Sequence, residues 1–167
     1  MEKLIITGGK KLGGEISVHG SKNAVLPIMA SALLIKGETV LHNVPNLSDV
    51  EASANILRRL GARVERKAST LIIDASSVTG NTIPEEMMRE MRSSIIFLGS
   101  LLSRCGEAWL CPPGGCDIGI RPIDLHISSL KKLGAQITEN GNCICCRALK
   151  LRGAKVFLSF PSVGATE

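Results

Sequence analysis

Aromatic residues are nearly absent from this sequence of 167 residues, since Phe and Trp together make up 2% and Tyr does not occur. Proteins that bind single-stranded nucleic acid stack the bases on aromatic side chains. The basic residues are also scattered rather than grouped, so we expect no nucleic-acid partner despite a net charge of +5. That charge suits phosphorylated small molecules better. With 44% hydrophobic residues, the chain can bury a core, and this core must be aliphatic.

Long apolar runs are lacking as well. No run approaches the roughly 18 residues of a membrane-spanning helix, and residues 1–7 lack the apolar stretch of a signal peptide. We therefore expect a cytoplasmic protein with no membrane partner, and six cysteines that are reduced thiols. Cys143, Cys145 and Cys146 could suggest a metal site, but no CxxC or His-rich segment accompanies them. We favour instead the interpretation that these cysteines are residues of a strand whose side chains alternate between its two faces. We therefore expect no metal ion, and we expect no cofactor.

The pattern of apolar, Gly and Pro residues predicts a mixed α/β chain. Ser48 and Glu51 have the spacing of a capping box at the start of one helix. The expected helices are 22–35, 49–60, 84–104 and 123–133, and the expected strands are 3–7, 15–18, 38–42, 63–66, 71–74, 107–111, 136–138, 143–147 and 155–159.

The chain contains an internal repeat. Leu-Gly-Ala occurs at 60–62 and again at 133–135, an offset of 73 residues, and Gly-Glu occurs at 37–38 and again at 106–107, an offset of 69. Four extra residues therefore lie between Glu107 and Leu133. This interval contains a loop rich in Pro and Gly, residues 111–122, so the second unit resembles the first with an elaborated loop.

Several residues in this framework are candidates for function. Cys116 is the first candidate for a reactive residue, because the elaborated loop around it is of the kind that often carries function. Arg121, five residues on, would favour the thiolate, and Asp117, next to the thiol, would oppose it. The offset of 69 pairs Lys22 and Asn23 with Met91 and Arg92, each pair standing where an apolar helix is expected to begin. Helix N-termini favour anions. By the same comparison we expect a third unit to start near Ser162, shortly before the sequence ends.

Taken together, Lys22-Asn23, Arg92, the Pro-Gly-Gly-Cys loop, residues 121–126 and residues 162–166 resemble the UDP-N-acetylglucosamine 1-carboxyvinyltransferase family. The resemblance covers this whole chain but only part of a usual family member. It implies an α/β enolpyruvyl transferase fold of repeated β-α-β-α-β-β units about a pseudo-threefold axis, with the active site between two domains. Residues 1–17 would be the first strands of the other domain. Residues 18–167 would form the domain of the catalytic loop, with units at about 18–75 and 76–150 and the start of a third.

The resemblance also implies a reaction, the first committed step of peptidoglycan synthesis, in which phosphoenolpyruvate donates its enolpyruvyl group to the 3′-hydroxyl of UDP-N-acetylglucosamine and phosphate is released. Cys116 would be the proton donor and the target of fosfomycin. Phosphoenolpyruvate would be bound by Lys22, Asn23 and Arg121. UDP-N-acetylglucosamine would be bound by Arg92, Arg121, Pro122, Ile123, Asp124, Leu125, Ser162, Val163 and Gly164.

Some positions depart from the family pattern, and others have no assigned role in the reaction. Phe160 stands where some relatives have a Lys, so a charged contact to the diphosphate from that side is not expected. His126 is assigned to packing or to support of the loop. The family's Asp general base and a late Arg belong to a C-terminal part of the enzyme that is not in this sequence, so we expect no turnover from these residues alone. The alternatives are a shikimate-pathway enolpyruvyl transferase, a family without the loop cysteine, and a non-catalytic partial copy that binds a nucleotide sugar or a partner protein.

Overall fold

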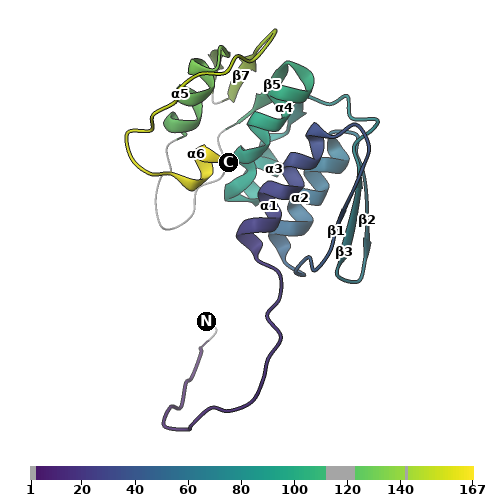
Figure 1. The fold of residues 1–167 in the computed structure, drawn as a ribbon, viewed down its shortest axis with the longest axis vertical. Coiled ribbons are helices and arrows are strands. Elements are labelled where there is room, and N and C mark those ends of the chain that lie inside the picture. Colours follow the sequence, from purple (N-terminus) through teal and green to yellow (C-terminus); the bar gives the residue numbers. More distant parts are fainter. Residues whose placement is uncertain (1–2, 112–122, 142) are drawn as a thin grey trace.

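The computed structural model describes residues 3–111, 123–141 and 143–167 and, for Arg92, the backbone alone. Residues 3–20 form an extended segment that leaves the body of the molecule (Figure 1). The strands expected at 3–7 and 15–18 are not formed, because a strand needs a neighbour for its N–H and C=O groups and no described strand pairs with this segment. Its apolar side chains, such as Leu4 (87% exposed), remain in solvent.

The first half of the body consists of two helices packed on each other and a small antiparallel sheet, which the second helix contacts. The strand order is β1-β3-β2, and both outer strands are antiparallel to β3. The elements are α1 Lys22–Ser31, the 3-10 helix η1 Ala32–Leu34, β1 Glu38–Leu41, α2 Ser48–Arg59, β2 Arg63–Lys67 and β3 Thr70–Asp74.

The second half has a sheet of order β4-β5-β7-β6, in which β4 is parallel to β5 and the other pairs are antiparallel. The strand expected at 155–159 is not formed, since no described strand pairs with these residues. The elements are β4 Thr82–Ile83, α3 Glu85–Glu90, the 3-10 helix η2 Arg92–Ile96, α4 Phe97–Cys105, β5 Glu107–Leu110, α5 Asp124–Lys132, β6 Gln136–Asn140, β7 Cys143–Arg147 and α6 Val163–Thr166.

The two sheets repeat one another. The order β1-β3-β2 recurs as β5-β7-β6, with β1 and β5 beginning 69 residues apart and each of the other pairs beginning 73 residues apart. Helices α2 and α5 also end alike, on Gly61 (φ +103°) and Gly134 (φ +97°) in the left-handed region. In both, the alanine after the glycine donates its N–H to the carbonyl five positions back, at 3.0 Å. The glycines thus turn the chain from helix into strand at matching places.

The capping box predicted at Ser48 and Glu51 is not formed. Helix α2 begins at Ser48, so the capping position falls on Leu47, whose side chain has no acceptor. The N–H groups of Val50 and Glu51 donate instead to the Leu47 carbonyl, at 3.1 and 3.3 Å. The helix expected at 22–35 is also shorter, since it ends at Ser31 and tightens into η1.

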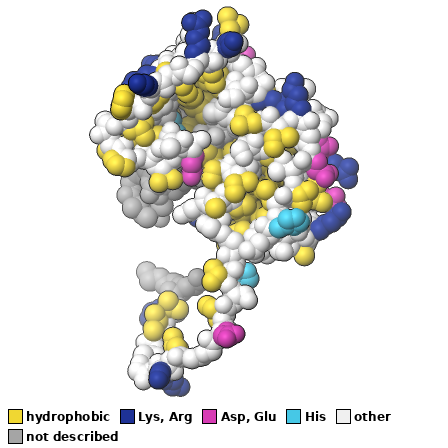
Figure 2. Space-filling view, viewed as in Figure 1, with side chains coloured by type: hydrophobic (Ala, Val, Ile, Leu, Met, Phe, Trp, Pro, Cys, Tyr) yellow, Lys and Arg dark blue, Asp and Glu magenta, His cyan; other side chains and the backbone are white. Residues whose placement is uncertain are grey.

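A single aliphatic core joins the two halves. Met29, Leu57 and Leu101, on α1, α2 and α4, are each 0% exposed, as is Phe97 at the start of α4. Apolar side chains also remain on the surface: Figure 2 shows them over the region of α1 and α2 and along the N-terminal segment, and Ile28 of α1 is 45% exposed. Within the described ranges, none of the helices combines the length and the hydropathy needed to cross a membrane.

Candidate active site

The N-terminal ends of α1 and α2 meet at an ion pair. Lys22, the first residue of α1, donates from Nζ to Oδ2 of Asp49 at 2.8 Å. Asp49 lies in the first turn of α2, where a carboxylate is stabilised by the helix dipole. Asn23, next to Lys22, is exposed. Sequence reasoning missed Asp49, because nothing in the local pattern links it to a residue 27 positions away.

The helical segment η2, which begins at Arg92, connects this end of the molecule to the rest of the candidate site. It contacts both α1 and α6, and α6 in turn contacts α5, beside which it lies in Figure 1. The elements that carry the predicted residues in the described part of the chain therefore form one continuous series, α1, η2, α6 and α5. Cys116, Arg121 and Pro122 lie outside the described residues, and for Arg92 only the backbone is placed.

The start of α5 carries three of the predicted residues. Ile123 precedes the helix, Asp124 is its first residue and acidic, and Leu125 is 8% exposed. Leu125 packs into the protein, so a contact with a ligand from this position would have to come from its backbone.

The turn at the start of α6 is organised by Ser162. Its Oγ accepts a hydrogen bond from the N–H of Ala165 at 3.3 Å, and its carbonyl accepts one from Oγ1 of Thr166 at 2.7 Å. The first N–H groups of a helix have no partner within it. With Ser162 fixed in this way, the backbone at Val163 and Gly164 can present N–H groups to an anion.

His126 of α5 packs against this turn. Its Nε2 lies 3.5 Å from the position that a Cβ would take on Gly164, which is an ordinary van der Waals distance. Neither ring nitrogen has a hydrogen bond of ordinary geometry within the described residues, but the Gly164 backbone is near enough to oppose the effect of burial on the pKa. Burial lowers the pKa of His126, so the imidazole is favoured in its neutral form. The contact joins α5 to α6, and it supports the packing assignment made from the sequence.

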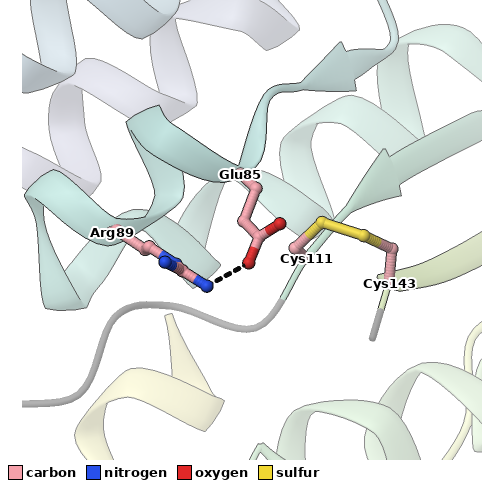
Figure 3. Close-up of a disulfide and its surroundings, with 4 residues drawn as sticks. All are labelled: Glu85, Arg89, Cys111 and Cys143. Atoms are coloured by element: carbon pink, nitrogen blue, oxygen red, sulfur yellow. Dashed lines mark hydrogen bonds and ion pairs between the residues drawn. A yellow bond between two sulfur atoms is a disulfide. The ribbon is translucent and has the colours of Figure 1, made fainter. Parts of the chain in front are cut away.

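The expectation of six reduced thiols is wrong for one pair, because Cys111 and Cys143 form a disulfide (Figure 3). The register of β5 and β7 sets Leu110 opposite Ile144, so the next step along the two strands brings the two cysteines face to face. The sequence alone did not show this register. Figure 3 also shows the ion pair between Glu85 and Arg89 of α3 beside the disulfide.

Cys145 and Cys146 lie in β7, so the strand expected at 143–147 is confirmed, but their burial does not alternate because both faces of this part of the strand are covered. Cys145 is 2% exposed and Cys146 is 0% exposed. Burial raises the pKa of Cys146 to about 11, which keeps this thiol protonated and unreactive near neutral pH. Neither residue has the character of a nucleophile.

The fold defines the class of the protein. It is similar to the enolpyruvyl transferase NikO from Streptomyces tendae, with a TM-score of 0.73 and 21% identity over 87% of this chain and 32% of that chain. It is also similar to the EPSP synthase from Acinetobacter baumannii, with a TM-score of 0.72 and 19% identity over 92% of this chain and 36% of that one. The predicted enolpyruvyl transferase fold is therefore confirmed.

The family follows from the sequence. The family model described as EPSP synthase (3-phosphoshikimate 1-carboxyvinyltransferase) matches residues 6–167, and the chain belongs to this family. It is 47% identical, over 100% of its length and 40% of the relative, to UDP-N-acetylglucosamine 1-carboxyvinyltransferase 2 of Caldanaerobacter subterraneus subsp. tengcongensis. It is 52% identical, over 99% of its length and 39% of the relative, to UDP-N-acetylglucosamine 1-carboxyvinyltransferase of Chloroherpeton thalassium. The chain spans about 40% of the length of these relatives.

Proposed function

We propose that the chain is part of an enzyme that transfers the enolpyruvyl group of phosphoenolpyruvate to the 3′-hydroxyl of UDP-N-acetylglucosamine and releases phosphate. The relatives of that name, at 47% and 52% identity, support this choice over shikimate 3-phosphate as the acceptor. The observation that carries it is the continuous series of α1, η2, α6 and α5, since these elements bear the residues expected to bind the two substrates.

Phosphoenolpyruvate is assigned to the N-terminal end of α1. Lys22 supplies a full positive charge at a helix terminus that already favours anions, and Asn23 adds an amide that can donate a hydrogen bond. Arg121 is the third proposed contact, because a guanidinium can bind a phosphate or carboxylate through two parallel hydrogen bonds.

UDP-N-acetylglucosamine is assigned to the other end of the series. The turn at Ser162, Val163 and Gly164 offers backbone N–H groups to the diphosphate, and Arg92 adds charge at the start of η2. The stretch from Arg121 to Leu125 completes the proposed site at the start of α5, where α5 contacts α6.

The chemistry has two steps. In the addition, the 3′-hydroxyl oxygen forms a bond to C2 of phosphoenolpyruvate, its proton passes to a base, and C3 takes up a proton. In the elimination, C3 gives up a proton, the bond from C2 to the phosphate oxygen breaks, and the double bond forms again. We assign the protonation of C3 to the Cys116 thiol, a group that can act as an acid or a nucleophile when its surroundings tune its pKa. By the family resemblance, the base belongs to the part of the enzyme outside this sequence.

We place this enzyme in the cytoplasm, in peptidoglycan synthesis. Residues 18–167 would form its catalytic-loop domain, in two units at about 18–75 and 76–150 and the start of a third. Residues 1–17 would pair as strands with the remaining part of the same enzyme. The exposed apolar side chains of Leu4, Ile5 and Ile6, at 81–87%, support this, because such a surface is costly to leave in water.

Covalent labelling by fosfomycin tests the reactive residue. The full-length enzyme that contains this chain is incubated with fosfomycin in the presence of UDP-N-acetylglucosamine and analysed by intact mass and peptide mapping. We expect one adduct, on Cys116, that is lost in Cys116→Ser and kept in Cys105→Ser, since Cys105 is the exposed free thiol of α4. An adduct on another cysteine, or none, would contradict the assignment.

Ligand binding distinguishes the acceptor substrates. We expect UDP-N-acetylglucosamine, and not shikimate 3-phosphate, to shift the amide NMR signals of Ser162–Gly164 and of α5. The reverse result would favour the shikimate-pathway alternative. Binding of the nucleotide sugar without any labelling of Cys116 would favour a non-catalytic protein that binds nucleotide sugars.

A further inference from the structure

A carboxylate that the sequence did not single out holds the proposed phosphoenolpyruvate ligand Lys22. The Lys22 Nζ donates to Oδ2 of Asp49 at 2.8 Å, and each residue lies in the first turn of its helix. We propose that Asp49 is a positioning residue, which holds the Lys22 ammonium where it meets the phosphate or carboxylate of phosphoenolpyruvate. This inference rests on the proposed function of Lys22.

The chemistry of lysine explains why a partner would be needed. Its ammonium is a point charge on a flexible four-carbon stem, and the Lys22 side chain is 49% exposed, so the packing around it restricts it only in part. The ammonium carries three N–H donors. One donor to Asp49 fixes the direction of the group, and two are left for an anion. The Asp49 side chain is itself less mobile, because it is 29% exposed and short.

The fold does not depend on this pair. Exposed ion pairs contribute little to stability, and α1 and α2 are held together by buried side chains such as Leu26 and Leu57. The repeat supports the same conclusion. The offsets of 69 and 73 relate Lys22 to Met91 and Asp49 to Pro122, so the second unit has no charged pair at the corresponding positions. The pair thus belongs to a task of the first unit rather than to the shared scaffold.

The sign of the effect separates positioning from simple electrostatics. Removal of a negative charge beside an anion site strengthens anion binding if only Coulomb attraction counts. If Asp49 positions Lys22, Asp49→Asn weakens binding instead. We expect a loss of about tenfold in affinity for phosphoenolpyruvate, the lower end of the loss seen when a group that orients a metal ligand is removed.

The chain offers a matched control. Glu51 lies in the same first turn of α2, but its Oε1 pairs with Arg58 at 2.7 Å rather than with Lys22. Glu51→Gln removes the same charge from the same helix end. We expect the affinity of this variant for phosphoenolpyruvate to be unchanged or slightly higher.

The experiment is an NMR titration of the full-length enzyme that contains this chain, saturated with UDP-N-acetylglucosamine, with phosphoenolpyruvate. It compares wild type, Asp49→Asn, Asp49→Glu, Glu51→Gln, Lys22→Ala and the double variant Lys22→Ala/Asp49→Asn. We expect Asp49→Glu to recover part of the affinity. We also expect the double variant to bind no more weakly than Lys22→Ala, because Asp49 acts through Lys22.

The outcomes separate this inference from the proposed function. No binding of phosphoenolpyruvate by the wild-type full-length enzyme would overturn the role of Lys22 and the inference with it. Binding by the wild type with equal or tighter binding by Asp49→Asn, or additive losses in the double variant, would overturn the inference alone. A thermal midpoint of Asp49→Asn far below that of Glu51→Gln would show a structural role and would also overturn it.

Discussion

Gly20 stands directly before the segment that carries Lys22, and its lack of a side chain is required by a close backbone contact. A Cβ at this position would lie 2.0 Å from the carbonyl oxygen of Asn43 and 3.3 Å from Cδ of Pro45. The opposing turn is poorly able to move, because Asn43 is held at φ +56° and the N–H of the next residue, Val44, donates to the carbonyl of Ser69 at 2.7 Å. The first obstacle is thus backbone rather than a flexible side chain.

We therefore expect Gly20→Ala to lower the free energy of unfolding by roughly 1–3 kcal/mol, the usual cost of forcing an extra group into a packed site. The matched control is Gly99→Ala in α4, where a Cβ meets nothing within 4 Å. Since alanine favours a helix interior over glycine by up to about 1 kcal/mol, this variant should be as stable as wild type or more stable.

Urea unfolding checks both variants, followed by circular dichroism for the helices and by the fluorescence of Trp109, the single tryptophan. For a chain of this size, about 1 kcal/mol corresponds to a shift of roughly 2–4 °C in thermal midpoint. If Gly20→Ala unfolds at the same urea concentration and temperature as wild type, or if Gly99→Ala is the more destabilised of the two variants, the steric argument is refuted.

Three further outcomes are expected. Hydrogen bonding from Arg147 is the main cause that lowers the pKa of Glu107 below its ordinary value of 4.5. Ionised Glu107 therefore stabilises the folded state above that pH, and this contribution is lost as the pH falls through the folded-state pKa. In Glu107→Gln, the urea midpoint should therefore depend less on pH below pH 4.5. The disulfide of Cys111 and Cys143 spans 32 positions, so its reduction should lower the free energy of unfolding by about 2–4 kcal/mol. Mass spectrometry after alkylation should find these two thiols labelled only in reduced samples, and labelling without reductant would contradict the pairing. With its pKa at about 11, Cys146 should resist iodoacetamide at pH 8 in the folded chain and react in urea, and fast labelling of the folded chain would refute its burial.

Local signals in the sequence were sufficient for much of the fold. Most helices and strands of the body follow from apolar periodicity, and the Leu-Gly-Ala triplets mark where two helices end, because only glycine adopts the left-handed conformation of Gly61 and Gly134 at no steric cost. The repeat offsets also predicted two similar sheets. The strands expected at 3–7, 15–18 and 155–159 are not formed within the described residues, because strand-like composition does not supply a partner strand.

The sequence by itself determined the family, the repeat, the aliphatic core and the identity of most candidate site residues, since these depend on composition, on spacing and on motifs read along the chain. Only the tertiary structure decided which residues meet: Lys22 with Asp49, His126 with the backbone at Gly164, and Cys111 with Cys143. Each of these contacts joins residues 27 to 38 positions apart. Helix packing and strand register bring residues this far apart in the sequence into contact. Both depend on the global fold, so no local sequence pattern predicts them.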